Sequence, residues 1–441
     1  MSATPVRTKV HLGAMTFLQY AINSMWVVPL VSCLDKVGYG NVEIGQTGTV
    51  SKLISWVGWI GWEYTPLAWA AIISPLFVGM IADRFFASEK VMAALNLLGG
   101  GFLYLAATVV VGADGKPQPW LFFWLLLAHC LCYMPTWSLT YSITFAHLQD
   151  PAKEFPIIRV LSVLGWIAAS LISPIGFYAF GIERIEETVW PLKIAAVLCV
   201  GTGIYNLFLP HTPPPAAGKK VTVGALLGLN ALGLLKDLNF AVFMAASLLI
   251  MIPGCFYWNY YNDLLVEIKM PFPQLVQSIA QASELVVTMF LSFFLLRMSF
   301  KSMVCLGLLA WSVRYLLFAC GVFPAYEWTN FIALALHGVA FAFIFTIGAA
   351  YVDKKAPKQV QASAQGLFAL VTLGVGQLGG ALLGGKMLDH YAVRNGAEIV
   401  GRHWVQYWLW PAAMAGLVTL LFCVTFRDKL YLRPETDSQG L

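Results

Sequence analysis

The chain has 441 residues, of which 59% are hydrophobic and only 11% are charged, against roughly 25% charged residues in ordinary soluble proteins. Its 27 Lys and Arg and 22 Asp and Glu are too few to cover a soluble surface. The net charge of +5 is small and scattered, which argues against a nucleic-acid-binding protein. The apolar content excludes disorder, and the length excludes a small disulfide-rich scaffold. We therefore expect an all-α polytopic membrane protein.

Apolar runs long enough to cross a bilayer recur twelve times along the chain. A crossing helix needs about 20 mainly apolar residues. Runs of this kind lie at 12–34, 65–82, 91–112, 119–146, 158–180, 189–210, 239–262, 273–297, 302–323, 328–352, 364–388 and 404–426.

The stretch 46–64 fits none of these spans. It is short, rich in tryptophan, and carries Lys52 and Glu63. Because tryptophan favours the headgroup level of a membrane, we interpret it as an interfacial segment or as an extension of the second span. The first ten residues are polar and lead directly into a span, so we expect no cleaved signal peptide.

The predicted loops on one side of the membrane carry most of the Lys and Arg residues. Positive charge marks cytoplasmic loops, so we expect both termini in the cytoplasm and the protein in the inner membrane. The longest cytoplasmic connection, 211–238, opens with three consecutive prolines that cannot continue a helix. It separates a half at 1–210 from a half at 239–441. Two halves of six helices are the layout of major facilitator transporters, which favours a transporter over a receptor or an enzyme.

Polar residues follow one face of the span at 273–297. The steps between them are three or four residues, so all of them share one helix face: Gln274, Gln277, Gln281, Glu284 and Thr288. Glu284 lies eleven residues after Pro273, roughly 16 Å into the membrane at 1.5 Å per residue. An ionisable group at that depth is usually functional. The alternative is a set of hydrogen bonds between helices.

Three other spans carry candidate site residues. Arg159, Ser162 and Trp166 recur at helical spacing on the span at 158–180, although Arg159 could also extend toward the inner headgroups. His337 and Phe341 align on the span at 328–352, where a packing histidine is the alternative. Asn259 lies in an aromatic run, 256–263, that suits either a binding rim or a membrane-interface belt. Arg314 follows no polar stripe, and we interpret it as structural.

Short motifs in chain order resemble the nucleoside:proton symporter family of the major facilitator superfamily. Gly79, Asp83 and Arg84 belong to a degenerate form of the superfamily's loop motif between spans two and three. More specific are the motifs at 17–20, 133–136, 155–159, 209–211, 281–284, 310–314 and 362–366, and the resemblance covers about residues 12–430.

The resemblance implies where a nucleoside would bind, namely between the two halves. It assigns substrate binding to Arg159, Gln281, Glu284 and Phe341. At other positions the family's residues are replaced, with Trp166 in place of a phenylalanine and His337 in place of a tyrosine. Further replacements are Val163, Cys255, Trp258 and Ala342, with Asn259 adjacent to one of them.

Together these observations predict a secondary active transporter that imports nucleosides with protons by alternating access, with Glu284 and His337 as candidates for proton coupling. We expect a monomer whose partners are the nucleoside, protons and the lipid bilayer, with no cofactor, no metal and no nucleic acid. A proton-coupled sugar or glycoside symporter on the same fold is the first alternative, and a membrane sensor that does not translocate is the second. No nucleophile–base pair points to an enzyme.

Overall fold

The computed structural model describes residues 4–42, 49–74, 86–214, 224, 229–358, 360–396 and 398–428. Apart from one short hairpin, its secondary structure is helical. The first half contains α1 (Val6–Val27), α2 (Leu30–Lys36), α3 (Thr49–Val57), α4 (Trp59–Trp62), α6 (Ser88–Val109), α7 (Pro119–His147), α8 (Pro151–Ser170), α9 (Ile172–Phe180) and α10 (Trp190–Asn206).

The second half begins after a 3₁₀ segment, Leu229–Lys236. Its helices are α12 (Leu238–Glu267), α13 (Pro273–Met289), α14 (Leu291–Arg297), α15 (Phe300–Cys320), α16 (Thr329–Ala335), α17 (His337–Phe341), α18 (Ile347–Lys355), α19 (Gln361–Ala369), α20 (Gln377–His390) and α21 (Trp404–Thr425). Wider π-helical turns join α17 to α18 at Ala342–Thr346 and α19 to α20 at Leu370–Gly376. An antiparallel hairpin, β1 (Ala392–Asn395) and β2 (Glu398–Arg402), precedes α21.

The described residues contain nine helices long and apolar enough to cross a membrane. A tenth crossing forms if α13 and α14, bent by 52° against each other, count as one span. Of the other two predicted spans, α10 has 17 residues, and the second span is helical from 65 to 74. The rest of that span, with the loop-motif residues Gly79, Asp83 and Arg84, lies outside the described residues. The helices are therefore consistent with twelve crossings.

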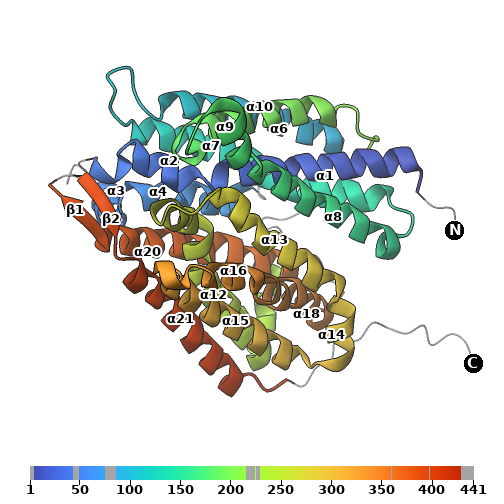
Figure 1. Cartoon of the computed structure of the whole chain (residues 1–441). Helices are drawn as coiled ribbons and strands as arrows, with labels where there is room; N and C mark the ends of the chain where they lie inside the picture. The colour runs from blue at the N-terminus through green and yellow to red at the C-terminus, as the bar shows by residue number, and fades with distance from the viewer. Residues whose placement is uncertain are drawn as a thin grey trace, which may run out of the picture.

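The helices form two bundles, one from each half of the chain (Figure 1). In the first bundle α1 packs on α8 and α10, and α6 packs on α7 and α10. In the second, α12 packs on α20 and α21, and α15 packs on α21. Both chain termini lie at one end of the molecule, which we call the terminal end, and the hairpin lies at the opposite end, the hairpin end.

The two bundles touch through a few helices. The α8 and α9 helices of the first half pack on α13 of the second, and α2 packs on α12. The α3 and α4 helices pack on α20, where Gly61 and Gly385 bring the two backbones into direct contact because neither has a Cβ. Trp59 and Trp62 of α4 are buried. The described part of this tryptophan-rich stretch, 49–64, thus leads into the helical residues 65–74.

Candidate functional site

The centre of the molecule contains an ion pair between the two halves. Arg159 of α8 and Glu284 of α13 approach to 2.7 Å between Nη2 and Oε1. Both side chains are largely buried, with 23% and 12% of their surfaces exposed. The stripe on α13 and the polar face on α8, predicted separately, therefore meet. Arg159 contacts a side chain of the opposite half and does not extend toward a headgroup.

Tyrosines of the first half complete the surroundings of Arg159. Its Nη1 donates to the hydroxyl of Tyr20 on α1, and the guanidinium lies 5.2 Å from the centre of the Tyr20 ring. The hydroxyls of Tyr20 and Tyr141 are 2.9 Å apart. Ser162, one turn along α8, lies 3.3 Å from the same Nη1. The sequence pattern had indicated Ser162 but gave no role to Tyr141, since a single tyrosine in a span is ordinary.

Aromatic rings of the second half form a wall beside the ion pair. Phe341 stacks on His337 at 5.6 Å between ring centres and contacts Phe345 at 5.0 Å. Trp258 of α12 lies edge-on to Phe341 at 6.3 Å. The wall packs closely against α13 beside Glu284. Gly338 permits this close approach, because a Cβ at this position would collide with the backbone of Ser283. His337, Phe341 and Trp258 therefore lie together in this wall.

Gln281, Trp166 and Asn259 occupy three further places, and His337 belongs to the wall. Gln281 lies one turn from Glu284, with its Oε1 buried and without a hydrogen-bond partner among the described residues. Trp166 is half-buried on α8, the helix of Arg159. Asn259 is buried on α12, next to Trp258. His337 is 1% exposed, and its Nδ1 has no hydrogen-bond partner in the described part of the chain.

A second ionic cluster joins the halves at the hairpin end. Arg402 of β2 donates to Asp263 of α12 and, through Nη2 at 2.7 Å and Nη1 at 3.1 Å, to Asp35 of α2. Only 2% of the Arg402 side chain is exposed. Burial acts against its charge, yet Asp263 and Asp35 hold the pKa of Arg402 above its ordinary value. The predicted span 239–262 ends before Asp263, and Arg402 lies between the predicted spans 364–388 and 404–426, so the sequence alone does not point to this cluster.

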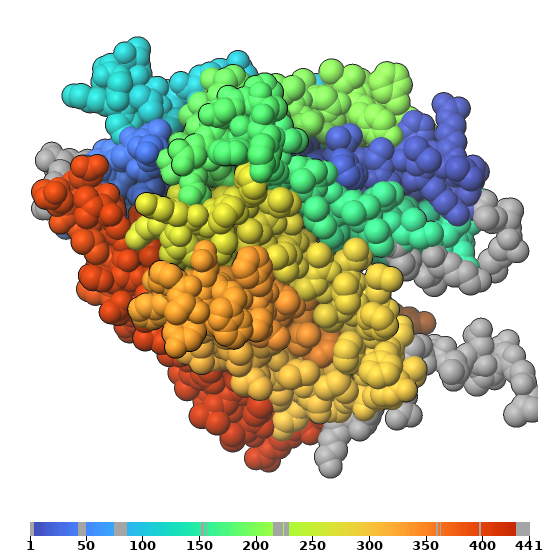
Figure 2. Space-filling model, viewed as in Figure 1, coloured from blue at the N-terminus to red at the C-terminus, as the bar shows by residue number. Residues whose placement is uncertain are grey.

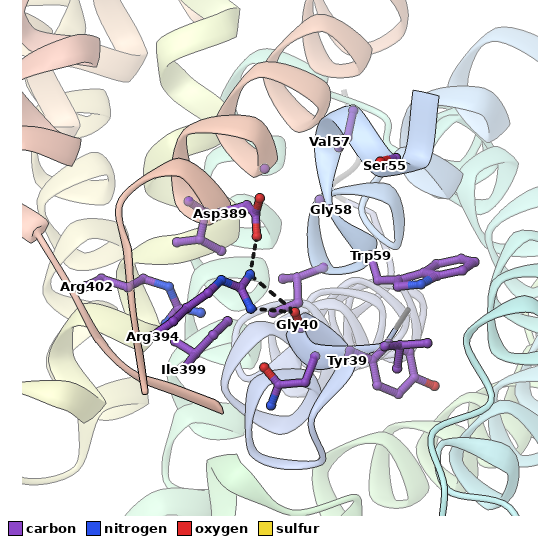
Figure 3. A pocket seen from close by; sticks show the side chains of 16 residues that line it. Tyr39, Gly40, Ser55, Val57, Gly58, Trp59, Asp389, Arg394, Ile399 and Arg402 are labelled. Atoms are coloured by element: carbon purple, nitrogen blue, oxygen red, sulfur yellow. Dashed lines mark hydrogen bonds and ion pairs between the residues drawn. The ribbon is translucent and has the colours of Figure 1, made fainter. Parts of the chain in front are cut away.

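Weaker contacts accompany this cluster. Asn262 donates to the hydroxyl of Ser32 at 2.8 Å, and Gln274 donates to the carbonyl of Ser24 at 2.9 Å. On β1, Arg394 binds Asp389 at 2.6 Å and approaches the carbonyl of Gly40 at 3.4 Å. Figure 3 shows Arg394 crossing a cavity of about 280 Å³ between the hairpin and α3–α4. This cavity lies at the hairpin end, away from the central ion pair.

The terminal end differs from the hairpin end. The hydrogen bonds that cross between the halves in the described residues lie at the hairpin end and at the central ion pair. Figure 2 shows the surfaces of the two halves meeting at the hairpin end and drawing apart toward the terminal end. The arrangement is that of a transporter closed on one side, with a central polar site between two bundles.

Comparison with known proteins agrees with this geometry. Residues 6–430 match the family described as nucleoside H+ symporters. The chain belongs to the nucleoside H+ symporter family. YegT of Escherichia coli (strain K12), a provisionally named nucleoside transporter, is 36% identical over 426 residues, which cover 96% of this chain and 95% of YegT.

A second relative is similar along almost its whole length, both in sequence and in structure. The nucleoside permease NupG of the same bacterium is 28% identical, with 98% of each chain covered. A crystal structure of a NupG point mutant superposes with a TM-score of 0.82 at 26% identity, covering 95% of this chain and 100% of that one. The fold is thus that of the major facilitator superfamily. As a member of this family, the chain is a proton-coupled nucleoside transporter and not an enzyme.

Proposed function

We propose that the transporter couples nucleoside import to protons at the Arg159–Glu284 ion pair. The observation that supports this is that the pair joins the two halves at the central site, 2.7 Å apart. A group that binds both the proton and the substrate can couple them, because each then changes the affinity for the other. A proton on Glu284 removes the charge that holds Arg159. The guanidinium then becomes available to a hydroxyl of the substrate.

The site residues divide between the two parts of a nucleoside. Arg159, Gln281 and Glu284 carry donors and acceptors suited to the ribose hydroxyls, and charge-assisted hydrogen bonds of this kind are strong. Phe341 and Trp166 offer ring faces for the base, with His337 and Asn259 at its edge. The Oε1 of Gln281, which has no partner within the described part of the chain, supports this division, since a buried acceptor without a donor is costly unless a ligand supplies one.

Glu284 and His337 were both candidates for the proton-coupling group, and the geometry favours Glu284. Glu284 contacts Arg159 across the two halves. His337 packs among Tyr257, Trp311 and Phe341 within the second half. We therefore assign the coupling proton to Glu284, and to His337 a contact with the base.

The orientation follows from the positive loops. The terminal end carries the excess of Lys and Arg, which supports cytoplasmic termini in an inner membrane. The hairpin end then faces outward, and the structure corresponds to a state open toward the cytoplasm. We expect the monomer to be the transporting unit, since each half contributes one residue of the ion pair.

Uptake of radiolabelled uridine into proteoliposomes tests this function. We expect accumulation when the outside is more acidic than the inside, and little accumulation without the gradient. Unlabelled nucleosides should compete, whereas hexoses should not. Competition by hexoses without competition by nucleosides would favour the sugar symporter, and binding without net uptake would favour a sensor.

A further inference from the structure

Arg314 is a buried cation beside the aromatic wall, and the described residues give it no ionic partner. It lies on α15 with 0% of its surface exposed. Its Nε donates to the carbonyl of Ala333 at 2.8 Å. Its Nη1 and Nη2 have no hydrogen-bond partner among the described residues. The backbone hydrogen bond gives Nε a structural role. It does not explain why a charge is buried here, since burying an unpaired charge is expensive.

Aromatic rings connect Arg314 to the base side of the site. The guanidinium carbon lies 4.3 Å from the centre of the Tyr257 ring and 4.8 Å from that of Trp311. The same two rings contact His337, at 5.5 Å and 6.0 Å between ring centres. His337 in turn stacks on Phe341. Only one layer of rings therefore separates the guanidinium from the wall, and the positive charge acts on both Tyr257 and His337.

The charges around the centre do not cancel. Arg159 and Glu284 neutralise each other as an ion pair. The charge of Arg314 remains, so these three side chains sum to one positive charge. If Glu284 takes a proton, as the proposed function requires, the sum rises to two. Inside a protein, where the effective dielectric constant is well below that of water, such a field acts strongly on a bound solute.

We propose that Arg314 makes the base subsite selective for nucleosides whose heterocycle is acidic or rich in acceptors, such as a dioxopurine that readily becomes an anion. This inference rests on the proposed nucleoside function. Arg314 acts as a specificity-determining residue through its field and does not touch the substrate. A unit charge about 10 Å from the ligand, at an effective dielectric constant of about 20, changes affinity on the order of tenfold.

Two pairs of nucleosides test the proposal on the purified full-length protein at one fixed pH. Xanthosine is compared with inosine, and 5-fluorouridine with uridine, since the first base of each pair gives up a proton more readily. For the wild type we expect tighter binding of the more acidic member, by about tenfold for xanthosine. Arg314→Gln should bring both ratios close to one. Arg314→Lys keeps the charge and should keep the ratios.

Arg297→Gln is the matched control. Arg297 also lies over an aromatic ring, 4.0 Å from the centre of Phe293, but it is exposed at the end of α14. Its loss should leave both ratios unchanged. A purely structural role of Arg314 would instead weaken all four nucleosides equally.

The outcomes separate this inference from the proposed function. If the wild type binds no nucleoside at all, the proposed function fails. If nucleosides bind and the wild type shows no preference within either pair, or if Arg314→Gln retains the preference, the role of Arg314 is overturned. Should Arg314→Gln not fold, the wild-type ratios and the Arg314→Lys variant still decide.

Discussion

Glu284 combines burial, an ionic partner and a position between the halves, and each of these properties suits the proposed coupling role. Replacing it by glutamine keeps the shape and the hydrogen-bonding capacity but removes the titrating group. We expect Glu284→Gln to lose proton-driven accumulation of uridine while retaining exchange of internal for external uridine. Both are measurable in the same proteoliposomes. Accumulation against a gradient by this variant would show that another group carries the proton.

The ring faces of Trp166 and Phe341 test how the base is held. Stacking of a base on an aromatic side chain contributes about 1–3 kcal/mol in nucleic-acid platforms. Trp166→Ala and Phe341→Ala should therefore each raise the dissociation constant roughly 5- to 150-fold. The loss should be similar for purine and pyrimidine nucleosides, since every base has a π-face.

Calorimetry on purified protein measures this effect, and the melting temperature provides the control. Phe341 packs against Phe345 and His337, so its loss could also lower stability. Weakened binding at an unchanged melting temperature supports the stacking role. Unchanged affinity in both variants would remove the main reason to place the base at this wall and would favour the sugar alternative.

At the scale of elements, the β1–β2 hairpin connects the halves at the hairpin end, which faces outward in the proposed orientation. Removing one partner of a buried ion pair costs about 3–5 kcal/mol, because the opposite charge stays buried and unpaired. In Arg402→Met the carboxylates of Asp35 and Asp263 would be buried and unpaired only while the outer side is closed. We therefore expect this variant to shift the population toward the outward-open state. Each ~1.4 kcal/mol of this cost changes the ratio of the two states tenfold.

A cysteine at position 262 reports this shift. Asn262 is 2% exposed and bonded to Ser32 across the halves. In a background without native cysteines, Asn262→Cys should react slowly with an impermeant maleimide added from outside. Adding Arg402→Met should accelerate the reaction at least tenfold. Arg394→Met breaks an exposed pair worth about 0–1 kcal/mol and should change the rate little. Equal rates in both variants would contradict an outer lock at Arg402.

For the whole molecule, Glu154 joins the start of the chain to the first bundle. Its carboxylate binds Lys9 at 2.6 Å and the backbone amide of Thr4 at 3.1 Å. The hydrogen bond from Lys9, followed by that from Thr4, lowers the pKa of Glu154 from 4.5 to about 2. A lowered pKa stabilises the folded state above the unfolded pKa, and this contribution is lost as the pH falls through about 2.

Glu154→Gln should therefore have a lower melting temperature than the wild type at pH 7. This difference should stay constant down to about pH 5 and shrink as the pH falls below the ordinary pKa of glutamate, about 4.3. Thermal unfolding of both proteins in detergent measures it. Glu398→Gln, which removes a carboxylate at an exposed position of β2, is the control and should leave the melting temperature at pH 7 nearly unchanged. A difference that grows toward low pH would contradict the role of the ion pair.

The sequence by itself determined the number of apolar spans, the division into two halves and the polar faces of individual helices. A membrane helix must satisfy its backbone internally, so hydropathy and the period of 3.6 residues determine what each span looks like. The sequence therefore identified Arg159, Glu284, His337 and Phe341 before any contact between them was known.

Only the tertiary structure decided which of these faces meet. The pairing of Arg159 with Glu284 and the cluster of Arg402 with Asp35 and Asp263 join residues more than 100 positions apart. Nothing in local spacing indicates such partners, because they depend on how the two bundles pack. The same holds for Arg314, because only its surroundings in space show that Nη1 and Nη2 have no hydrogen-bond partner among the described residues. The sequence gives the sign of each side-chain charge, whereas the tertiary structure decides which groups that charge interacts with.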